Sequence, residues 1–281
     1  MKTLNLKESL KTAVKAAQAA GAMMRDHLHS EKKINLAVQH DIKLELDVRC
    51  QSLIQRTLLA DFPETALLGE EGVHGKKTAS WRWVVDPIDG TVNFAYGIPH
   101  ACVSIALQKR KPDPVQPRDF DSANIRDDDA AYETVVGVVY DPFLDELWTA
   151  TRGERARLNG KMIRVSRRAR LSEAVISLGF AKSKATMEKT LPAFNNLIHR
   201  VRKIRIMGAA ALAMTYVASG RFDAYVEAGI RLWDIAAGGL ILECAGGEFW
   251  HRQLPGEHTY AIVANNGLLR RTLERTSRLP T

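Results

Sequence analysis

The sequence of 281 residues predicts a layered α/β protein of the α+β kind. Two patterns support this prediction. Short β-rich runs crowd the middle of the chain, and in its second half strands alternate with helices, which is typical of helices stacked against sheets. The composition, with 46% hydrophobic and 26% charged residues, is that of a globular chain long enough to bury a substantial core.

The first half is expected to begin with two helices and to continue with four strands. Residues 5–28 place Leu6 and Leu10 at helical spacing among many alanines. A second helix is expected over residues 44–60, ending before Pro63. The four β-rich runs that follow are residues 82–86, 101–108, 135–140 and 146–150.

A polar stretch, residues 111–133, separates the second of these strands from the third. It carries three prolines and several aspartates, and it has no clear apolar period. This pattern predicts a long loop or insertion between two strands, with no role that the residues assign.

The second half alternates more regularly. Strands are expected at residues 175–180, 223–227 and 260–264, and helices at residues 187–200, 209–219, 232–245 and 267–276. Gly220 ends the alanine-rich helix, and Gly246-Gly247 closes the next one. A boundary near residues 165–170 is expected to divide an N-terminal domain, residues 1–168, from a C-terminal domain, residues 169–281.

Charge and cysteine content narrow the classes of protein. The formal net charge is +8, but Lys and Arg fall in short clusters without interleaved aromatics, so solvated surface charge is favoured and no nucleic-acid partner is expected. No run approaches the roughly 18 apolar residues of a membrane span, and no secretion signal opens the chain, so we expect a cytoplasmic protein. Cys50, Cys102 and Cys244 are expected to be buried, reduced thiols.

The most informative segment is residues 83–94, Trp-Val-Val-Asp-Pro-Ile-Asp-Gly-Thr-Val-Asn-Phe. An apolar strand runs into Asp86, where Pro87 is expected to stop it. Asp86 and Asp89 are three residues apart around a tight bend, so both carboxylates can face one point, and two hard oxygen ligands there suit Mg²⁺. The Ile88 carbonyl between them is a candidate third oxygen.

Gly90 and Thr91 follow at once. Gly90 has no Cβ, so a ligand can approach the backbone closely. If a helix begins here, its first N–H groups and its dipole favour a phosphate. One short segment therefore offers metal ligands and a phosphate cradle side by side.

Three further carboxylates are weaker signals on their own. Glu70 belongs to a Gly-Glu-Glu-Gly run that follows an apolar pair, and a solvated acidic turn explains it equally well. Asp234 lies near the start of an apolar helix, where an N-cap is the simpler interpretation. Asp47 lies on an amphipathic helix, where a lone Asp is most often solvated.

Taken together and in this order, the segments resemble the inositol monophosphatase family over nearly the whole chain. Residues 86–93 are similar to its Asp-Pro-Ile-Asp-Gly-Thr signature, residues 233–238 to its C-terminal signature, and residues 220–227 to the strand before it. The resemblance implies a layered αβαβα sandwich of the inositol monophosphatase and fructose-1,6-bisphosphatase type.

The resemblance also implies a metal centre. Glu70, Asp86 and the Ile88 carbonyl would hold one ion. Asp86, Asp89 and Asp234 would hold a second ion. A third, more weakly bound ion would be coordinated by Glu70 through a water molecule. The implied cofactor is Mg²⁺, as two or three ions, with Mn²⁺ as a possible substitute.

The remaining roles come from the same resemblance. Glu70, Thr91 and Asp47 would be the catalytic residues, with Thr91 and Asp47 orienting the attacking water. The implied substrate-binding residues are Asp89, Gly90, Thr91, Glu227 and Asp234. Among them, Gly90 and Thr91 would donate backbone N–H groups to the phosphate, and Glu227 would contact substrate hydroxyls.

Three departures from the family pattern stand out. Leu44 replaces a threonine that often precedes the catalytic aspartate, which puts the role of Asp47 in doubt. Ala209 replaces a small hydroxyl residue beside the substrate pocket, which puts specificity in doubt. Residues 111–133 exceed the usual hairpin loop.

The implied function is Mg²⁺-dependent hydrolysis of a small phosphate monoester, first myo-inositol 1-phosphate, by a lithium-sensitive homodimer. Phe94 resembles the inositol type of the superfamily. Fructose 1,6-bisphosphate, histidinol phosphate, NADP and 3′-phosphoadenosine 5′-phosphate are alternative substrates within the same fold. A catalytically silent anion-binding regulator and a nucleic-acid-binding module are the alternatives from other classes.

Overall fold

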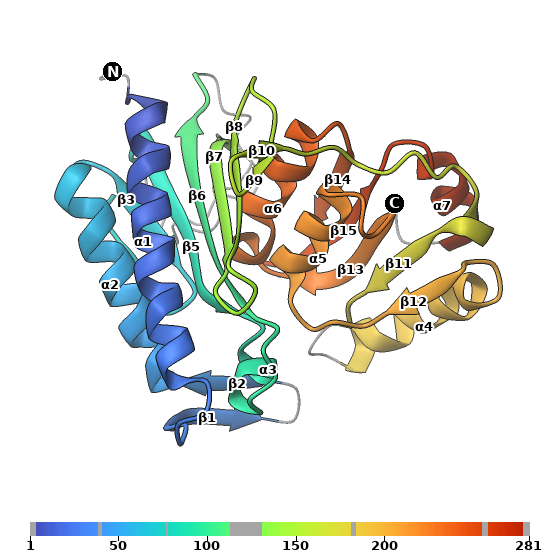
Figure 1. The fold of residues 1–281 in the computed structure, drawn as a ribbon, viewed down its shortest axis with the longest axis horizontal. Helices are drawn as coiled ribbons and strands as arrows, with labels where there is room; N and C mark the ends of the chain where they lie inside the picture. The colour runs from blue at the N-terminus through green and yellow to red at the C-terminus, as the bar shows by residue number, and fades with distance from the viewer. Residues whose placement is uncertain are drawn as a thin grey trace.

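The computed structural model describes residues 4–38, 41–76, 78–112, 131–180, 184–254 and 258–277. Within these ranges the chain forms an eight-stranded sheet, a five-stranded sheet and a separate two-stranded hairpin. Helices cover the outer face of each sheet and fill the space between the sheets, which makes five layers (Figure 1). The predicted layered α/β fold is therefore confirmed.

Helices α1 (Leu6–His27) and α2 (Glu45–Asp61) form the first layer. The side chain of Asn5 accepts hydrogen bonds from the N–H groups of Lys7 and Glu8, at 3.0 and 3.3 Å, and so caps α1. The alanines of α1 that face the sheet are fully buried and let the helix pack closely against strands β6 and β7: Ala13, Ala16, Ala17 and Ala20. Both helices lie within two residues of their predicted ranges.

The eight-stranded sheet is the second layer. Its order is β10 (Lys161–Met162), β9 (Arg157–Leu158), β8 (Glu146–Thr151), β7 (Tyr132–Asp141), β6 (Cys102–Arg110), β5 (Trp81–Asp89), β3 (Ala66–Gly69) and β4 (Gly72–His74). Strand β3 runs parallel to β5, and the other neighbours are antiparallel. Strand β7 begins at Tyr132, so the end of the predicted loop at residues 111–133 is strand. Residues 113–130 of that loop lie outside the described residues.

Helices α5 (Ala210–Ala218) and α6 (Leu232–Cys244) form the middle layer. Both are strongly apolar, and most of their residues are buried, because each contacts a sheet on either side. A Cβ at Gly137 of β7 would lie 2.8 Å from the carbonyl oxygen of Ala237 on α6. Glycine is needed at this crossing for the helix to approach the sheet so closely.

The five-stranded sheet and its outer helices complete the sandwich. The order is β12 (Lys203–Arg205), β11 (Val175–Leu178), β13 (Ala224–Ile230), β15 (Tyr260–Asn265) and β14 (Glu248–Gln253). Helices α4 (Lys184–Ile198) and α7 (Arg270–Ser277) pack together on the outer side, and a short 3₁₀ turn, η2 (Leu171–Glu173), precedes β11.

Two small elements complete the fold near the ends of the large strands. The hairpin of β1 (Ile34–Val38) and β2 (Asp41–Leu44) belongs to neither large sheet. Helix α3 (Thr91–Ala95) directly follows β5 and contacts β2. Figure 1 shows the hairpin and α3 together at one end of the eight-stranded sheet.

The segment between the two large sheets is fastened by Asp223, which is fully buried. Its carboxylate accepts hydrogen bonds from the Ser166 hydroxyl, from Nε of Arg168 at 2.7 Å and from the backbone N–H of Val175 at 2.7 Å. The sheets divide between Met162 and Val175, which includes the expected boundary near residue 168. Whether residues 1–168 and 169–281 act as two domains stays a prediction.

Three sequence expectations need comment. Strand β5 does not stop at Pro87 but continues to Asp89, because a β-bulge absorbs the proline. Cys50 and Cys102 are buried as expected, whereas Cys244 is partly exposed. Among the described residues, no helix is both long and apolar enough to cross a membrane.

Candidate active site

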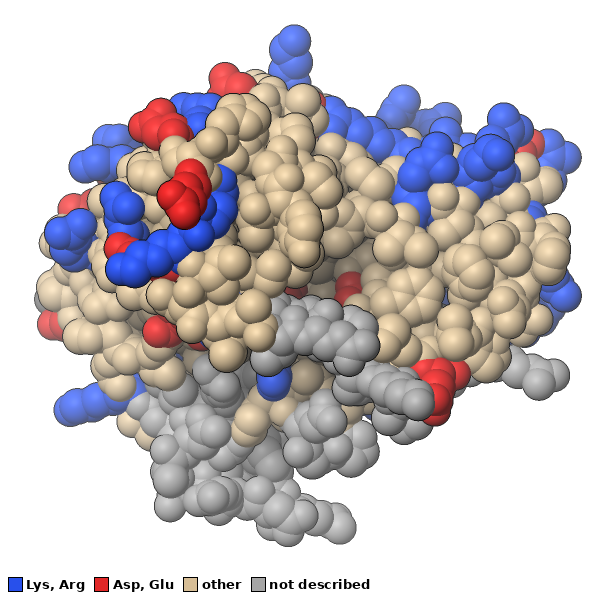
Figure 2. Space-filling view, turned by 90° about the horizontal axis from the view of Figure 1, so that it is seen from below, with Lys and Arg blue, Asp and Glu red and all other residues tan. Residues whose placement is uncertain are grey.

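A cavity of about 660 Å³ opens where both large sheets, α3 and the β1–β2 hairpin meet. All of the metal and substrate residues predicted from the sequence line it: Glu70, Asp86, Ile88, Asp89, Gly90, Thr91, Glu227 and Asp234. Figure 2 shows a hollow near the middle of one face with acidic side chains inside it, while Lys and Arg lie mostly toward the edges of that face. The predicted residues from both halves of the chain are therefore brought to one place.

Three carboxylates converge in this cavity. Oxygens of Asp86, Asp89 and Asp234 all lie within 4.8 Å of one another. In a regular strand, residues three apart point to opposite faces. The bulge in β5 places Asp86 opposite Ser104 and Asp89 opposite Cys102, so the extra residue turns both carboxylates toward the same side.

Asp89 is the most firmly held of the three. Its two oxygens accept hydrogen bonds from the N–H groups of Ala210, at 3.1 Å, and Ala211, at 2.7 Å, in the first turn of α5. The N-cap residue Ala209 makes no side-chain cap, so Asp89 caps this helix from another layer. The Cys102 thiol also donates to Asp89, at 3.6 Å. Burial raises the pKa of Asp89 to about 6, although these hydrogen bonds oppose the shift.

Asp86 and Asp234 are also oriented by backbone donors. The N–H of Ile88 donates to Asp86 at 3.0 Å, and the N–H of Arg231 donates to Asp234 at 2.7 Å. Asp234 is not the N-cap of α6, which is Arg231, but lies three residues inside the helix. Burial raises the pKa of Asp86 well above its ordinary value, and the charges of Glu70, Asp89 and Asp234 add to that shift.

This donor set fits a hard divalent cation. Buried carboxylates that repel one another are costly unless a cation lies between them. Asp86, Asp89 and Asp234 offer carboxylate oxygens as ligands, and a backbone N–H group orients each of them. Oxygen ligands suit Mg²⁺ or Mn²⁺ rather than a metal that prefers sulfur or imidazole. The residues present therefore fit the metal that the resemblance implies.

The turn after β5 has the geometry expected of a phosphate cradle. Gly90 has a φ of 90°, and helix α3 begins at the next residue. A Cβ at Gly90 would lie 2.9 Å from the carbonyl oxygen of His100, so both the conformation and the space require glycine. The Thr91 hydroxyl donates to the Ile88 carbonyl at 2.8 Å and fixes the turn. The first N–H groups of α3 have no partner within the helix.

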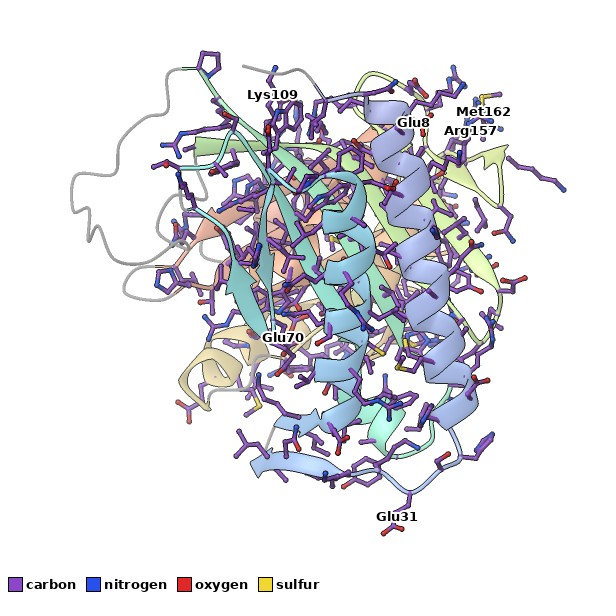
Figure 3. The ribbon with its side chains drawn as sticks, turned by 90° about the vertical axis from the view of Figure 1, so that its left-hand side faces the viewer. Glu8, Glu31, Glu70, Lys109, Arg157 and Met162 are labelled. Atoms are coloured by element: carbon purple, nitrogen blue, oxygen red, sulfur yellow. The ribbon has the colours of Figure 1, made fainter. Side chains whose placement is uncertain are left out.

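Glu70 lines the cavity beside the ends of β3 and β5. Glu70 follows β3, where its N–H donates to the carbonyl of Val85 at 3.2 Å, and Figure 3 shows it at the strand ends that face the β1–β2 hairpin. Glu70 lines the cavity but does not belong to the group of three closest carboxylates.

Asp47 is 3% exposed and is not among the described residues that line the cavity. Its Oδ2 accepts from the N–H of Leu44 at 2.7 Å, whereas Oδ1 is buried without a partner among the described residues. Burial raises the pKa of Asp47 to about 8, and the nearby charge of Glu70 contributes. Asp47 thus lies close enough to Glu70 for the charge of Glu70 to affect its pKa, but its catalytic role stays a prediction.

Glu227 lies on β13 and lines the cavity from the five-stranded sheet. The Tyr225 hydroxyl donates to its carboxylate, and burial together with the charge of Glu227 raises the pKa of Tyr225. A Cβ at Gly179 would overlap the Glu227 carboxylate, so the glycine makes room for it. This wall offers an oriented acceptor for hydroxyl groups.

Several residues of the cavity were not predicted from the sequence: Lys43, Ser177, Phe180, Arg231 and Thr259. Lys43 directly precedes Leu44, which departs from the family pattern. This departure was a signal in the sequence that could have drawn attention to Lys43. The others belong to apolar or mixed stretches that resemble ordinary strand and helix ends.

Known proteins resemble the chain in both sequence and fold. Residues 5–115 and 131–278 match the model of the inositol monophosphatase family. The chain is 36% identical over 250 residues to inositol monophosphatase 1 of Solanum lycopersicum, covering 86% of this chain and 84% of that protein. It is also 36% identical over 246 residues to Nus factor SuhB of Pasteurella multocida, covering 85% of this chain and 83% of that protein.

Solved structures agree. The extragenic suppressor protein suhB from Bartonella henselae superposes with a TM-score of 0.82 at 31% identity, covering 98% of this chain and 100% of that chain. Inositol monophosphatase from Anabaena (Nostoc) sp. PCC 7120 gives a TM-score of 0.79 at 32% identity, covering 99% of this chain and 98% of that chain. The αβαβα sandwich is thereby confirmed, and the chain belongs to the inositol monophosphatase family.

Proposed function

We propose that the protein hydrolyses a small phosphate monoester, first myo-inositol 1-phosphate, to the free alcohol and inorganic phosphate. One observation carries this proposal. Asp86, Asp89 and Asp234 converge within 4.8 Å of one another in a cavity that also contains the turn at Gly90 and Thr91. A cation site beside a helix start is an arrangement that attracts a phosphate.

The charges explain why a metal is required. A phosphate monoester and the carboxylates of the cavity repel each other, and both repel an attacking hydroxide. Bound Mg²⁺ would lower the pKa of a water, neutralise the phosphate and stabilise the leaving alkoxide. Asp86, Asp89 and Asp234, together with Glu70 and the Ile88 carbonyl, would hold these ions. The carbonyl oxygen has a second lone pair beside the hydrogen bond from Thr91.

The residues of the chain would then position the reactants. The backbone N–H groups of Gly90 and Thr91 would bind phosphate oxygens. The Thr91 hydroxyl donates its hydrogen bond to the Ile88 carbonyl, so its oxygen lone pairs remain available to accept a hydrogen bond from the attacking water. Asp47 would help Thr91 to orient that water, and Glu70 would take up its proton.

The opposite wall favours a polyol as the leaving group. The Glu227 carboxylate is oriented by Tyr225 and lines the cavity, where it can accept hydrogen bonds from substrate hydroxyls. Hydroxyl groups that could bind Glu227 are present in myo-inositol 1-phosphate and also in the sugar and nucleotide phosphates named above. The relative rates of phosphate release from these compounds therefore identify the substrate.

A phosphate-release screen tests the proposal. Purified protein is incubated with inositol, sugar, histidinol and nucleotide phosphates, with Mg²⁺ and with excess EDTA. We expect Mg²⁺-dependent release that is fastest for myo-inositol 1-phosphate and abolished by EDTA. If a nucleotide bisphosphate is hydrolysed at least about tenfold faster than myo-inositol 1-phosphate, a difference of about 1.4 kcal/mol in the barrier, the assignment of inositol phosphate as the substrate is wrong.

A second candidate comes from the names of relatives. Proteins called Nus factor SuhB are about as similar to this chain as those called inositol monophosphatase. A silent anion-binding regulator would release phosphate only at background across the whole panel. We favour the enzyme because all four proposed carboxylate ligands line the cavity and backbone N–H groups orient the three aspartates among them.

Three further expectations accompany the proposed enzyme. We propose that it acts as a homodimer, that lithium inhibits it and that it is located in the cytoplasm. Light scattering of the purified protein checks the first, and a lithium titration of phosphate release checks the second.

A further inference from the structure

A lysine lies at the acidic end of the cavity. Lys43 comes from β2, and its side chain lines the cavity beside Glu70. Its ammonium lies 2.9 Å from Oε1 of Glu71. The side chains of this pair are 33% and 11% exposed, so the pair is partly shielded from solvent and stronger than a surface ion pair.

The turn that carries the two glutamates is held in place. The N–H of Glu71 donates to Oε1 of Gln51 at 2.9 Å, and Nε2 of Gln51 donates to the Gly72 carbonyl at 3.3 Å. These bonds fix the backbone of the turn, so the Glu71 side chain starts from a defined position beside Lys43. Lys43 also acts on Asp47, whose pKa it lowers against the opposing effect of burial.

We propose that Lys43 competes with the most weakly held divalent ion for the Glu70–Glu71 turn. This inference rests on the proposed function. An ion that leans on Glu70 meets a positive charge already paired with the adjacent carboxylate, so the two cations repel. The other two proposed ions also have Asp86, Asp89 or Asp234 as direct ligands, and these carboxylates lie outside the Glu70–Glu71 turn, so those ions are affected less. The lysine thus limits how many ions the site holds at low metal concentration.

Mn²⁺ binding to the full-length protein tests the inference without relying on turnover. Free Mn²⁺ is measured by electron paramagnetic resonance during titration of wild type, Lys43→Met and Lys43→Arg. We expect Lys43→Met to tighten the weakest Mn²⁺ about tenfold, because a nearby positive charge is lost. The tighter ions should change by less than about twofold, and Lys43→Arg should behave like wild type because it keeps the charge.

A charge-matched control and a double variant sharpen the result. Lys33→Met removes a lysine that pairs with Glu45 and does not line the cavity among the described residues, and it should leave the weakest ion unchanged. Glu71→Gln should weaken that ion, and Lys43→Met with Glu71→Gln should return it close to wild type. Circular dichroism confirms that each variant is folded.

Two results would overturn the inference, and they differ in what else they overturn. If wild type binds Mn²⁺ and releases phosphate, but Lys43→Met leaves the weakest ion unchanged or weaker, only the role of Lys43 is wrong. If wild type binds no Mn²⁺, the metal centre of the proposed function is wrong as well.

Discussion

Asp89 serves two elements at once. As a carboxylate of the acidic cluster it faces Asp86 and Asp234, and as a helix cap it accepts hydrogen bonds from two N–H groups in the first turn of α5. Because Ala209 brings no hydroxyl of its own, α5 depends on Asp89 for its cap. The orientation of one proposed metal ligand and the position of a helix that lines the cavity are therefore coupled.

The first prediction follows from this coupling. Asp89→Asn removes a charge from the cluster but keeps one oxygen for the cap. We expect turnover to be nearly abolished while the protein still folds, as measured by phosphate release and a circular-dichroism melt. Asp26→Asn, an exposed change on α1, is the control and should leave the rate unchanged. If the variant keeps more than about a tenth of the wild-type rate, its activation barrier has risen by less than about 1.4 kcal/mol, and Asp89 is not a metal ligand.

Asp223 has a structural role of the same kind. Its buried carboxylate joins Ser166, Arg168 and Val175 across the segment between the sheets. Asp223→Asn should lower the free energy of unfolding by about 3 kcal/mol, because an amide cannot satisfy all three donors. Urea unfolding measures the loss. Glu173→Gln, in a pair with the exposed Arg170, should shift the unfolding midpoint much less; equal shifts would contradict the assigned role.

At the scale of elements, long periodic segments could be predicted and short ones could not. Helices α1, α2, α5 and α6 were predicted nearly to their ends because an apolar period runs through several turns. Strands β3 and β12 are only four and three residues long and show no alternation that marks them. They exist because neighbouring strands pair with them, which is information that lies elsewhere in the chain.

The bulge in β5 is a feature of the site that the local sequence could not predict. Proline usually ends a strand, so the sequence predicted a bend after Asp86. The prediction that Asp86 and Asp89 face one point was right, but the cause is an irregular register within a continuing strand. Register depends on the partner strand β6, and the local sequence of β5 does not contain it.

The turn between β5 and α3 supports a second kind of variant. Gly90→Ala should lower the free energy of unfolding by about 2–4 kcal/mol, because the new Cβ meets the His100 carbonyl in a left-handed conformation. The rate of phosphate release should fall at least about tenfold, since the Thr91 N–H shifts. Both are measured on purified protein.

A matched glycine separates conformation from contact. Gly160 has a φ of 77°, and a Cβ there would meet nothing within 4 Å. Gly160→Ala should therefore cost only the conformational part, about 1 kcal/mol, and leave the rate unchanged. If Gly90→Ala behaves like Gly160→Ala, the close approach to His100 is unimportant.

At the scale of the whole molecule, the cavity collects acidic groups from several layers, and this makes stability depend on pH. Burial raises the pKa values of Asp86 and Asp89, the latter to about 6, and that of Asp47 to about 8. A carboxyl whose folded pKa is raised stabilises the fold while protonated. The metal-free protein should therefore lose stability as pH rises from about 4, the unfolded value, to about 8.

Mg²⁺ should reverse this trend, because it binds the deprotonated carboxylates. In EDTA we expect the melting temperature to fall between about pH 5 and pH 8, whereas the gain from saturating Mg²⁺ should increase over the same range. Asp47→Asn should flatten the EDTA curve. Scanning calorimetry at several pH values measures all three effects. A Mg²⁺ gain that is the same at every pH would show that the raised pKa values do not belong to the ion site.

The site as a whole could be predicted to the extent that signatures carry it. Asp86, Asp89 and Asp234 were predicted by motif, and they do converge. Lys43 and Arg231 were missed because their place in the cavity depends on how the hairpin and α6 dock, which no local pattern reports. The burial of Asp47 likewise depends on the packing of α2.

The burial of α5 and α6 between the sheets also bears on how the chain is made. One face of the eight-stranded sheet, including Leu68, Val84 and Trp148, is covered by helices that begin only at residue 210. A ribosome must therefore finish about three quarters of the chain before that apolar surface has its cover, and until then the nascent polypeptide is prone to aggregate. Molecular chaperones that shield such surfaces should raise the yield of this protein, and messages truncated before residue 210 should give insoluble product.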